Sequence, residues 1–127
     1  MTERKIITTD KAPKAIGPYS QALLAGNTLY ISGQIGMDPA TGKLVADSAA
    51  EQTKQALENI KAVLAAADME LIHAVQMQVF LADIADFAKM NEVYASYFTG
   101  DFPTRAAFQV ADLPAGAKVE ILATAIK

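Results

Sequence analysis

Three segments in the second half of the chain alternate in polarity with a period of two, and this alternation most constrains the fold. The segments are residues 75–81, 105–110 and 118–126. Such alternation is typical of β-strands, because successive side chains point to opposite faces of a sheet. It predicts one wholly apolar face, formed by Val75, Met77, Val79, Leu81, Ala106, Phe108, Val110, Val119, Ile121, Ala123 and Ala125.

Two other segments have helical periodicity. Ser48 and Glu51 form a capping-box pattern that predicts the start of the first helix. Its apolar stripe follows at steps of three and four: Thr53, Leu57, Ile60, Leu64 and Ala67. A second helix is predicted from Asp83, with the stripe Phe87, Met90, Tyr94 and Tyr97. Shorter strands are predicted at residues 4–7, 20–25 and 28–32, with a tight turn at Gly26-Asn27.

Two helices can cover only one face of such a sheet. The predicted fold is therefore α+β: a single domain over residues 1–127, built as a two-layer sandwich with a mixed sheet of about six strands. The other sheet face mixes Gln, Phe, Ala, Leu and Thr with Arg105 and Glu120. This mixture suits a subunit interface, where polar groups find partners across the contact. An ordinary solvated face is the alternative.

Composition narrows the range of functions. The net charge of −3 argues against a nucleic-acid binder, since these proteins usually carry a basic patch. The absence of cysteine and the single histidine exclude thiolate chemistry and a histidine-based metal site. No apolar run is long enough to span a bilayer, and residues 1–7 have no signal-peptide pattern. We therefore expect a cytoplasmic protein.

Arg105 and Glu120 are the strongest candidates for chemistry. The chain has two arginines, Arg4 and Arg105, and a guanidinium offers a planar fork of donors that matches a carboxylate. An ordinary intramolecular salt bridge is the alternative for Arg105. If the strands pair with their apolar sets on one side, Glu120 lies on the same face as Arg105. A partly buried acid is costly unless it is paired or functional.

Other polar positions carry weaker signals. Tyr19 follows Gly17-Pro18 at the end of a loop, where its hydroxyl could face a cleft or simply pack. Gly33, after Ser32, permits close backbone approach to a ligand, or a bend. No Gly-x-Ser-x-Gly pattern surrounds Ser32, so a serine hydrolase is not indicated. His73 is expected to be structural or solvated.

Five collinear motifs resemble the Rid (YjgF-type) family, in particular its reactive intermediate deaminase A branch. They are residues 15–21 (AIGPYSQ), 30–36 (YISGQIG), 91–94 (NEVY), 102–107 (FPTRAA) and 119–121 (VEI). The resemblance implies a chorismate-mutase-like fold, homotrimers with clefts between subunits, and no cofactor or metal. It also implies hydrolysis of 2-imino acids, the unstable products of pyridoxal-phosphate dehydratases, to 2-oxo acids and ammonia.

The same resemblance implies a role for each matching residue. Arg105 would bind the substrate carboxylate, and Glu120 would hold or activate the attacking water. Backbone groups of Gly33 and Ala107 would hold the imine nitrogen, and the cleft would be lined by Tyr19, Ser32 and Asn91. This reaction suits the composition, because an imine carbon is already electrophilic and needs oriented water and proton transfer rather than a metal.

Three positions depart from the family pattern. Ala107 stands where many bacterial members have cysteine, Leu122 replaces a common acid, and Asp68 replaces a glycine that often ends the first helix. Two other functions stay open: an L-PSP-type endoribonuclease or translation inhibitor, and a non-catalytic trimer that senses a ligand or acts as a chaperone.

Overall fold

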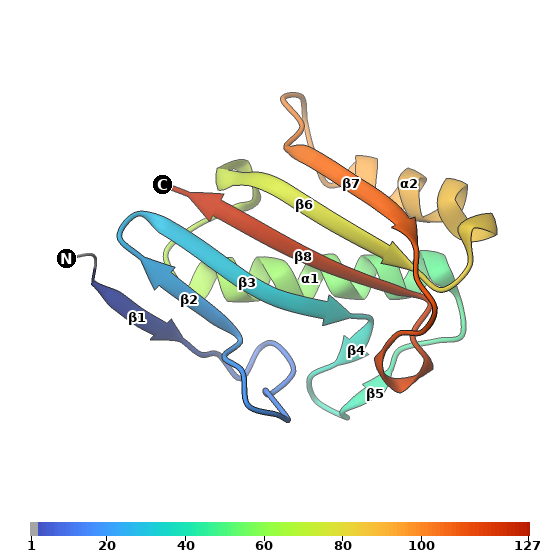
Figure 1. Cartoon of the computed structure of the whole chain (residues 1–127), viewed down its shortest axis with the longest axis horizontal. Coiled ribbons are helices and arrows are strands. Elements are labelled where there is room, and N and C mark those ends of the chain that lie inside the picture. Colours follow the sequence, from blue (N-terminus) through green and yellow to red (C-terminus); the bar gives the residue numbers. More distant parts are fainter. Residues whose placement is uncertain (1–2) are drawn as a thin grey trace.

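The computed structural model describes residues 3–127 and is built on a six-stranded mixed sheet (Figure 1). The strand order is β1-β2-β3-β8-β6-β7, in which β6 and β7 run parallel and all other neighbours run antiparallel. The strands are β1 (Arg4–Ile7), β2 (Ala22–Ala25), β3 (Thr28–Ile35), β6 (Ala74–Leu81), β7 (Thr104–Gln109) and β8 (Val119–Ile126). A separate small hairpin pairs β4 (Met37–Asp38) with β5 (Lys43–Leu44).

Both α-helices lie behind the sheet in Figure 1, so the predicted two-layer α+β arrangement is confirmed. Helix α1 (Ala49–Ala66) begins as expected, because the Ser48 side chain accepts a hydrogen bond from the Glu51 backbone N–H at 3.3 Å. Its predicted stripe is buried at Thr53, Leu57, Ile60 and Leu64. Among residues 3–127, neither helix is both long enough and apolar enough to cross a bilayer.

The second helix begins later than the sequence indicates. Asp83 does act as a cap, since its side chain accepts from the Ala85 N–H at 2.9 Å. It caps a 3₁₀ turn, Ile84–Asp86, however, and helix α2 proper spans Phe87–Ser96. Two further 3₁₀ turns, Leu71–His73 and Pro114–Gly116, precede β6 and β8.

Two predictions about side-chain direction are wrong. Val75 is 41% exposed, because a register irregularity between Ala74 and Gln76 interrupts the alternation of β6 at its start. In β7 the two faces are exchanged. Phe108 packs on Phe80 at a ring-centroid distance of 5.2 Å on the uncovered face, and Arg105 lies beside α2 on the covered face. Strand β7 is an edge strand with little burial, so polarity alone does not set which face its apolar set joins.

Buried amide side chains fasten the loops around the sheet. Gln21 accepts from the Thr9 N–H at 2.7 Å and donates to the Pro13 carbonyl at 2.7 Å, which ties residues 9–13 to the start of β2. On α1, Gln52 accepts from the Lys118 N–H at 2.8 Å, and Asn59 donates to the Met37 carbonyl at 3.0 Å. These bonds satisfy backbone groups that secondary structure leaves unpaired, and so make the loop positions definite.

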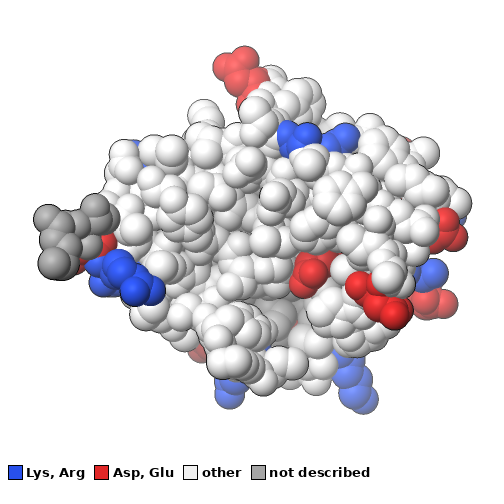
Figure 2. All heavy atoms as spheres, in the orientation of Figure 1, with Lys and Arg blue, Asp and Glu red and all other residues white. Residues whose placement is uncertain are grey.

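The uncovered face of the sheet is nearly free of charge. Strands β3, β6, β7 and β8 contain two charged residues between them, Arg105 and Glu120. Figure 2 shows this face with charged side chains mainly at its margin. Large side chains stand exposed on it, including Tyr30 (53%) and Phe108 (48%). A solvated sheet face usually carries more charge, so a buried role in an assembly remains the prediction for this face.

Gly36, between β3 and β4, marks the closest approach of α1 to the sheet. A Cβ atom at this position would lie 2.5 Å from the Cα and 2.7 Å from the carbonyl oxygen of Gln52. Both are backbone atoms of a helix that is packed on the core, so neither can move aside without moving the helix. Glycine at this position therefore sets the spacing between the two layers.

We expect Gly36→Ala to lower the free energy of unfolding by about 1–3 kcal/mol, as overpacking generally does. Urea unfolding at a fixed protein concentration measures this change. The matched control is Gly17→Ala, whose Cβ would meet only the Tyr19 ring at 3.4 Å and should change stability by less than about 0.5 kcal/mol. Equal stability of the two variants would show that α1 is not held at this distance.

Candidate functional site

Glu120 lies near the start of β8 and points to the uncovered face. It pairs in register with Phe80 of β6 and Ile35 of β3, and no side-chain hydrogen bond or ion pair to it is found among residues 3–127. Burial raises the pKa of its carboxyl group. A partly desolvated carboxylate without a cationic partner is a good proton acceptor, because its charged form is poorly stabilised.

Gly33 makes room for this carboxylate. A Cβ atom on Gly33 would lie 2.6 Å from Oε2 and 2.8 Å from Cδ of Glu120. The side chain of Glu120 therefore lies directly over the backbone of β3, at the register irregularity between Ile31 and Gln34. Any larger residue at position 33 would have to displace the Glu120 carboxylate.

Glu120, Gly33 and Tyr19 line one small cavity of about 100 Å³, which we call the glutamate pocket. Lys14, Met37 and Pro114 also line it, so loops from three parts of the chain close around the acid. Tyr19 is half exposed, and its hydroxyl lies 3.4 Å from the Ile16 N–H, from which it accepts. Three of the residues predicted from the sequence are thus brought together.

Ser32 has a supporting position beside this pocket. Its hydroxyl donates to the Ser20 carbonyl at 2.6 Å, and its N–H donates to the Gln21 carbonyl at 2.9 Å. These two bonds connect β3 to the segment that carries Tyr19. Ser32 therefore holds the loop in place and has its own donors satisfied within the chain.

Arg105 lies on the covered side of β7 and contacts α2. Its Nη1 donates to Asn91 Oδ1 at 2.7 Å, and its Cζ lies 4.8 Å from the Tyr94 ring centroid and 5.5 Å from that of Phe87. No carboxylate of residues 3–127 forms an ion pair with it, so the intramolecular salt bridge is not found. Arg105 and Asn91 line a cavity of about 280 Å³, the arginine pocket, with Tyr94, Ala95, Phe102 and Pro103.

Arg105 and Glu120 lie on opposite faces of the sheet, which corrects the expectation that they share one. Arg105 is in register with the fully buried Met77 under the helices. Glu120 is in register with Phe80 on the uncovered face. Neighbouring residues in register point to the same side of a sheet. The chain therefore presents an arginine half and a glutamate half that do not face each other.

Ala107 belongs with the arginine half. It is partly buried against the core, on the same side of β7 as Arg105. Since β7 is an edge strand, half of its backbone N–H and C=O groups have no neighbouring strand to pair with.

Sequence reasoning missed the role of two aromatic residues. Phe87 and Tyr94 were predicted as part of the core stripe of the second helix, and they also contact the guanidinium of Arg105. Burial raises the pKa of the Tyr94 hydroxyl, and the nearby Arg105 charge partly opposes that rise. The available signal was Asn91, a polar residue on the same helix face as Phe87 and Tyr94, at spacings of four and three.

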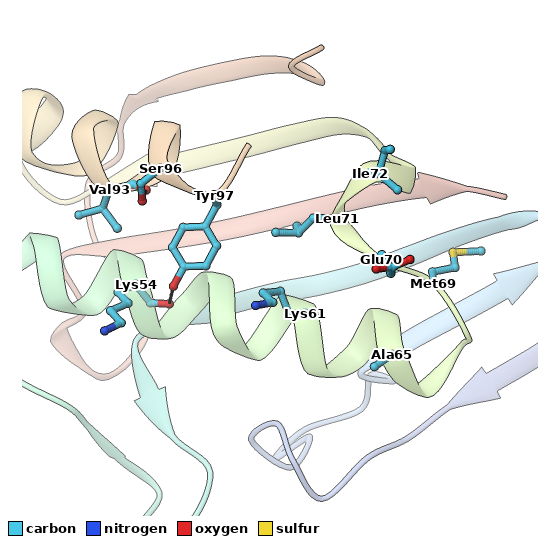
Figure 3. Close-up of a pocket in the computed structure, with 10 residues that line it drawn as sticks. All are labelled: Lys54, Lys61, Ala65, Met69, Glu70, Leu71, Ile72, Val93, Ser96 and Tyr97. Atoms are coloured by element: carbon cyan, nitrogen blue, oxygen red, sulfur yellow. Dashed lines mark hydrogen bonds between the residues drawn. The ribbon is translucent and has the colours of Figure 1, made fainter. Parts of the chain in front are cut away.

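A larger groove lies elsewhere, between α1 and the end of α2 (Figure 3). It has a volume of about 940 Å³ and is lined by Lys54, Lys61, Ala65, Met69, Glu70, Leu71, Ile72, Val93, Ser96 and Tyr97. The Tyr97 hydroxyl donates to Glu58 at 2.7 Å, and Lys61 lies 3.8 Å from the same carboxylate oxygen. Most polar groups that line this groove are thus paired within the chain. None of the predicted site residues lines the groove.

His73 has a structural role, as predicted. Its Nδ1 accepts a hydrogen bond from the Glu70 N–H at 2.9 Å and so closes the 3₁₀ turn before β6. No group of three His, Asp or Glu side chains within residues 3–127 converges where a metal ion could bind.

The chain is similar to known proteins along nearly its whole length. A family profile described as endoribonuclease L-PSP matches residues 9–127. The 2-iminobutanoate/2-iminopropanoate deaminase of Bos taurus is 57% identical over 124 residues, which cover 98% of this chain and 90% of that protein.

Solved structures agree with this similarity. RidA from an Antarctic Psychrobacter species is 47% identical, with a TM-score of 0.94 and coverage of 97% of this chain and 99% of that one. E. coli TdcF with bound serine is 44% identical, with a TM-score of 0.93 and coverage of 97% and 98%. At these identities the likeness extends beyond the fold to the sequence.

Because burial raises the pKa of Glu120, its ionisation should cost the folded state stability. The protonated form is favoured in the fold, so this cost appears as pH rises from the ordinary value of 4.5 through the raised pKa. When the pH is raised from about 4 to about 7.5, the free energy of unfolding of Glu120→Gln should increase relative to that of the unsubstituted chain, as measured by urea unfolding. A difference that is the same at both pH values would contradict a raised pKa.

Proposed function

This chain belongs to the endoribonuclease L-PSP family, and we propose that it hydrolyses 2-imino acids, such as 2-iminobutanoate and 2-iminopropanoate, to 2-oxo acids and ammonia. The deaminase activity for which the relative from Bos taurus is named supports this proposal, because the similarity covers 98% of the chain. The observation that carries it is the guanidinium of Arg105, which is oriented in a cavity and has no carboxylate partner among residues 3–127.

Arg105 is proposed to bind the substrate carboxylate. A guanidinium matches a carboxylate with two parallel hydrogen bonds, which fix the plane of the anion as well as its position. Asn91 occupies one donor of Nη1 and leaves other donors of the guanidinium for the substrate. The backbone beside Ala107 would then lie next to the imine group.

Glu120 is proposed to position the attacking water and to accept its proton. Water adds to the electrophilic carbon of the C=N bond, and its proton passes to Glu120 as the C–O bond forms. Glu120 passes this proton to the nitrogen, which gives the carbinolamine. When the carbinolamine collapses, Glu120 takes its hydroxyl proton and delivers it to the nitrogen, the C–N bond breaks, the C=O bond forms and the nitrogen leaves as ammonia. One water is consumed and no electrons are exchanged. A carboxylate with a raised pKa suits both proton transfers.

The two halves of the site are proposed to meet between subunits of a homotrimer. In one protomer Arg105 and Glu120 face opposite sides of the sheet. The uncovered face mixes apolar and uncharged polar side chains and is almost free of charge, as a subunit interface would be. A cyclic assembly gives each cleft the arginine pocket of one subunit and the glutamate pocket of its neighbour. Tyr19, Ser32 and Gly33 would then complete the cleft from the glutamate side.

The substrates imply their source. Free 2-imino acids hydrolyse and react readily, so they must be produced close to where they are consumed. Pyridoxal-phosphate dehydratases, which release enamines from hydroxy amino acids, are the class of enzyme that we propose supplies them.

Arg105→Ala should reduce kcat/KM for freshly generated 2-iminobutanoate by at least roughly 100-fold, because two charge-assisted hydrogen bonds are lost. Arg105→Lys should also be poor, since an ammonium cannot reproduce the planar fork. Ammonia release measures both. Arg4→Ala removes the other arginine, on β1 at the opposite edge of the sheet, and should leave activity unchanged. Full activity in Arg105→Ala would refute the proposal.

Mixing two inactive variants tests whether the site is shared. When Arg105→Ala and Glu120→Gln chains are unfolded together and reassembled in equal amounts, about a quarter of the clefts in a random cyclic assembly combine an intact arginine with an intact glutamate. We expect ammonia release to recover toward that fraction. If both residues served the same cleft from one subunit, no mixed assembly would recover activity.

A further inference from the structure

Three residues on one face of α2 hold the guanidinium of Arg105, and none of them is charged. Asn91 accepts from Nη1 at 2.7 Å, and the rings of Tyr94 and Phe87 lie 4.8 and 5.5 Å from Cζ. Their spacing of four and three residues places them in one row along the helix. An arginine at a protein surface is commonly held by a carboxylate, so this set of partners is distinctive.

Tyr94 contributes its ring rather than its hydroxyl. The side chain is 3% exposed, and its hydroxyl is buried without a hydrogen-bond partner among residues 3–127. An unpaired buried hydroxyl does not hold a neighbour in place. The ring also packs against Phe98, at a centroid distance of 4.9 Å. Tyr94 thus presents a rigid aromatic surface to the cation.

The choice of partner matters for the charge of the pocket. A ring face and an amide oxygen attract a guanidinium through a quadrupole and a dipole, and neither adds a negative charge. A carboxylate would orient the guanidinium equally well, but it would compensate its charge and compete with an anionic ligand for its donors. With the uncharged set, Arg105 is oriented and its full charge stays available.

We propose that Phe87, Asn91 and Tyr94 form an uncharged clamp that positions Arg105 for the substrate carboxylate. Phe87 and Tyr94 are positioning residues in this arrangement, since they act through Arg105 and need not touch the substrate. The inference rests on the proposed function, because it takes the carboxylate of a 2-imino acid as the ligand. It extends that function by making the lack of charge on these three residues the reason that the guanidinium stays free to bind the anion.

Substitutions at Tyr94 test the ring. Tyr94→Leu should raise KM for 2-iminobutanoate roughly twofold to fivefold, the size expected from a cation–π contact with a solvent-exposed guanidinium, and should change kcat less. Tyr94→Phe keeps the ring and should return KM to near the unsubstituted value. Tyr97→Leu is the matched control, because it removes an aromatic side chain at the end of the same helix whose ring lies by Lys61 and whose hydroxyl is bonded to Glu58. A KM in Tyr94→Leu that matches the control would overturn the clamp.

Asn91→Asp tests the charge without removing volume. The new carboxylate should pair with Arg105, so the thermal midpoint should stay the same or rise, while KM increases by roughly tenfold or more because the pocket loses its net positive charge. A purely structural role for Asn91 predicts no loss of affinity in a variant of undiminished stability. An unchanged KM in Asn91→Asp would overturn the proposal even if Tyr94→Leu is too unstable to assay.

Arg105→Ala, measured in the same series, separates the two levels of inference. If Arg105→Ala retains activity, the proposed function itself fails. If Arg105→Ala is inactive but Asn91→Asp and Tyr94→Leu keep the KM of the unsubstituted protein, the function stands and only the clamp is wrong.

Discussion

The direction of side chains along β7 and β8 is the constraint on which the rest of the molecule depends. Arg105 projects toward the helices, and Glu120 projects away from them. A strand cannot turn one residue to the other face without a shift of register, and such a shift would expose the whole buried set of Val119, Ile121 and Ala123. The core therefore fixes the separation of the two reactive groups.

The electrostatics of each half follow from this separation. Glu120 is partly desolvated without a cation, and Arg105 is held without an anion. For Glu120 this state is unfavourable, because a nearby opposite charge would stabilise the carboxylate. Both arrangements fit the proposal in which the partners are a substrate and a second subunit. A carboxyl group with a raised pKa that lines a cavity is typical of a functional site.

Much of the fold could be predicted from the sequence, because its signals are local. The Ser48 cap and the stripe of α1 lie within a few residues of one another, and the alternation of β8 is continuous. The side chosen by β7 could not be predicted in this way. The polarity pattern predicts that Phe108 faces the core, but its ring packs on that of Phe80 on the uncovered face. An edge strand has one neighbour, so its orientation is decided by contacts that are distant in sequence.

The candidate site, like the fold, could be predicted from the sequence only in part. Motif resemblance identified Arg105, Glu120, Gly33 and Tyr19, and the last three line one cavity. It did not reveal that Phe87 and Tyr94 contact Arg105, since aromatic residues at helical spacing look the same whether they fill a core or face a cation. Whether such a residue fills the core or faces a cation depends on which strand lies against α2, and a local sequence pattern does not contain that information.

The uncovered face also has a consequence for the life of the chain in a cell. Tyr30 and Phe108 stand out on a surface with very few charges, so a newly made, correctly folded protomer is adhesive before it meets another copy. If this face is the interface proposed above, the time that a lone protomer spends before assembly governs its exposure to aggregation, and that time lengthens as the concentration of the chain falls.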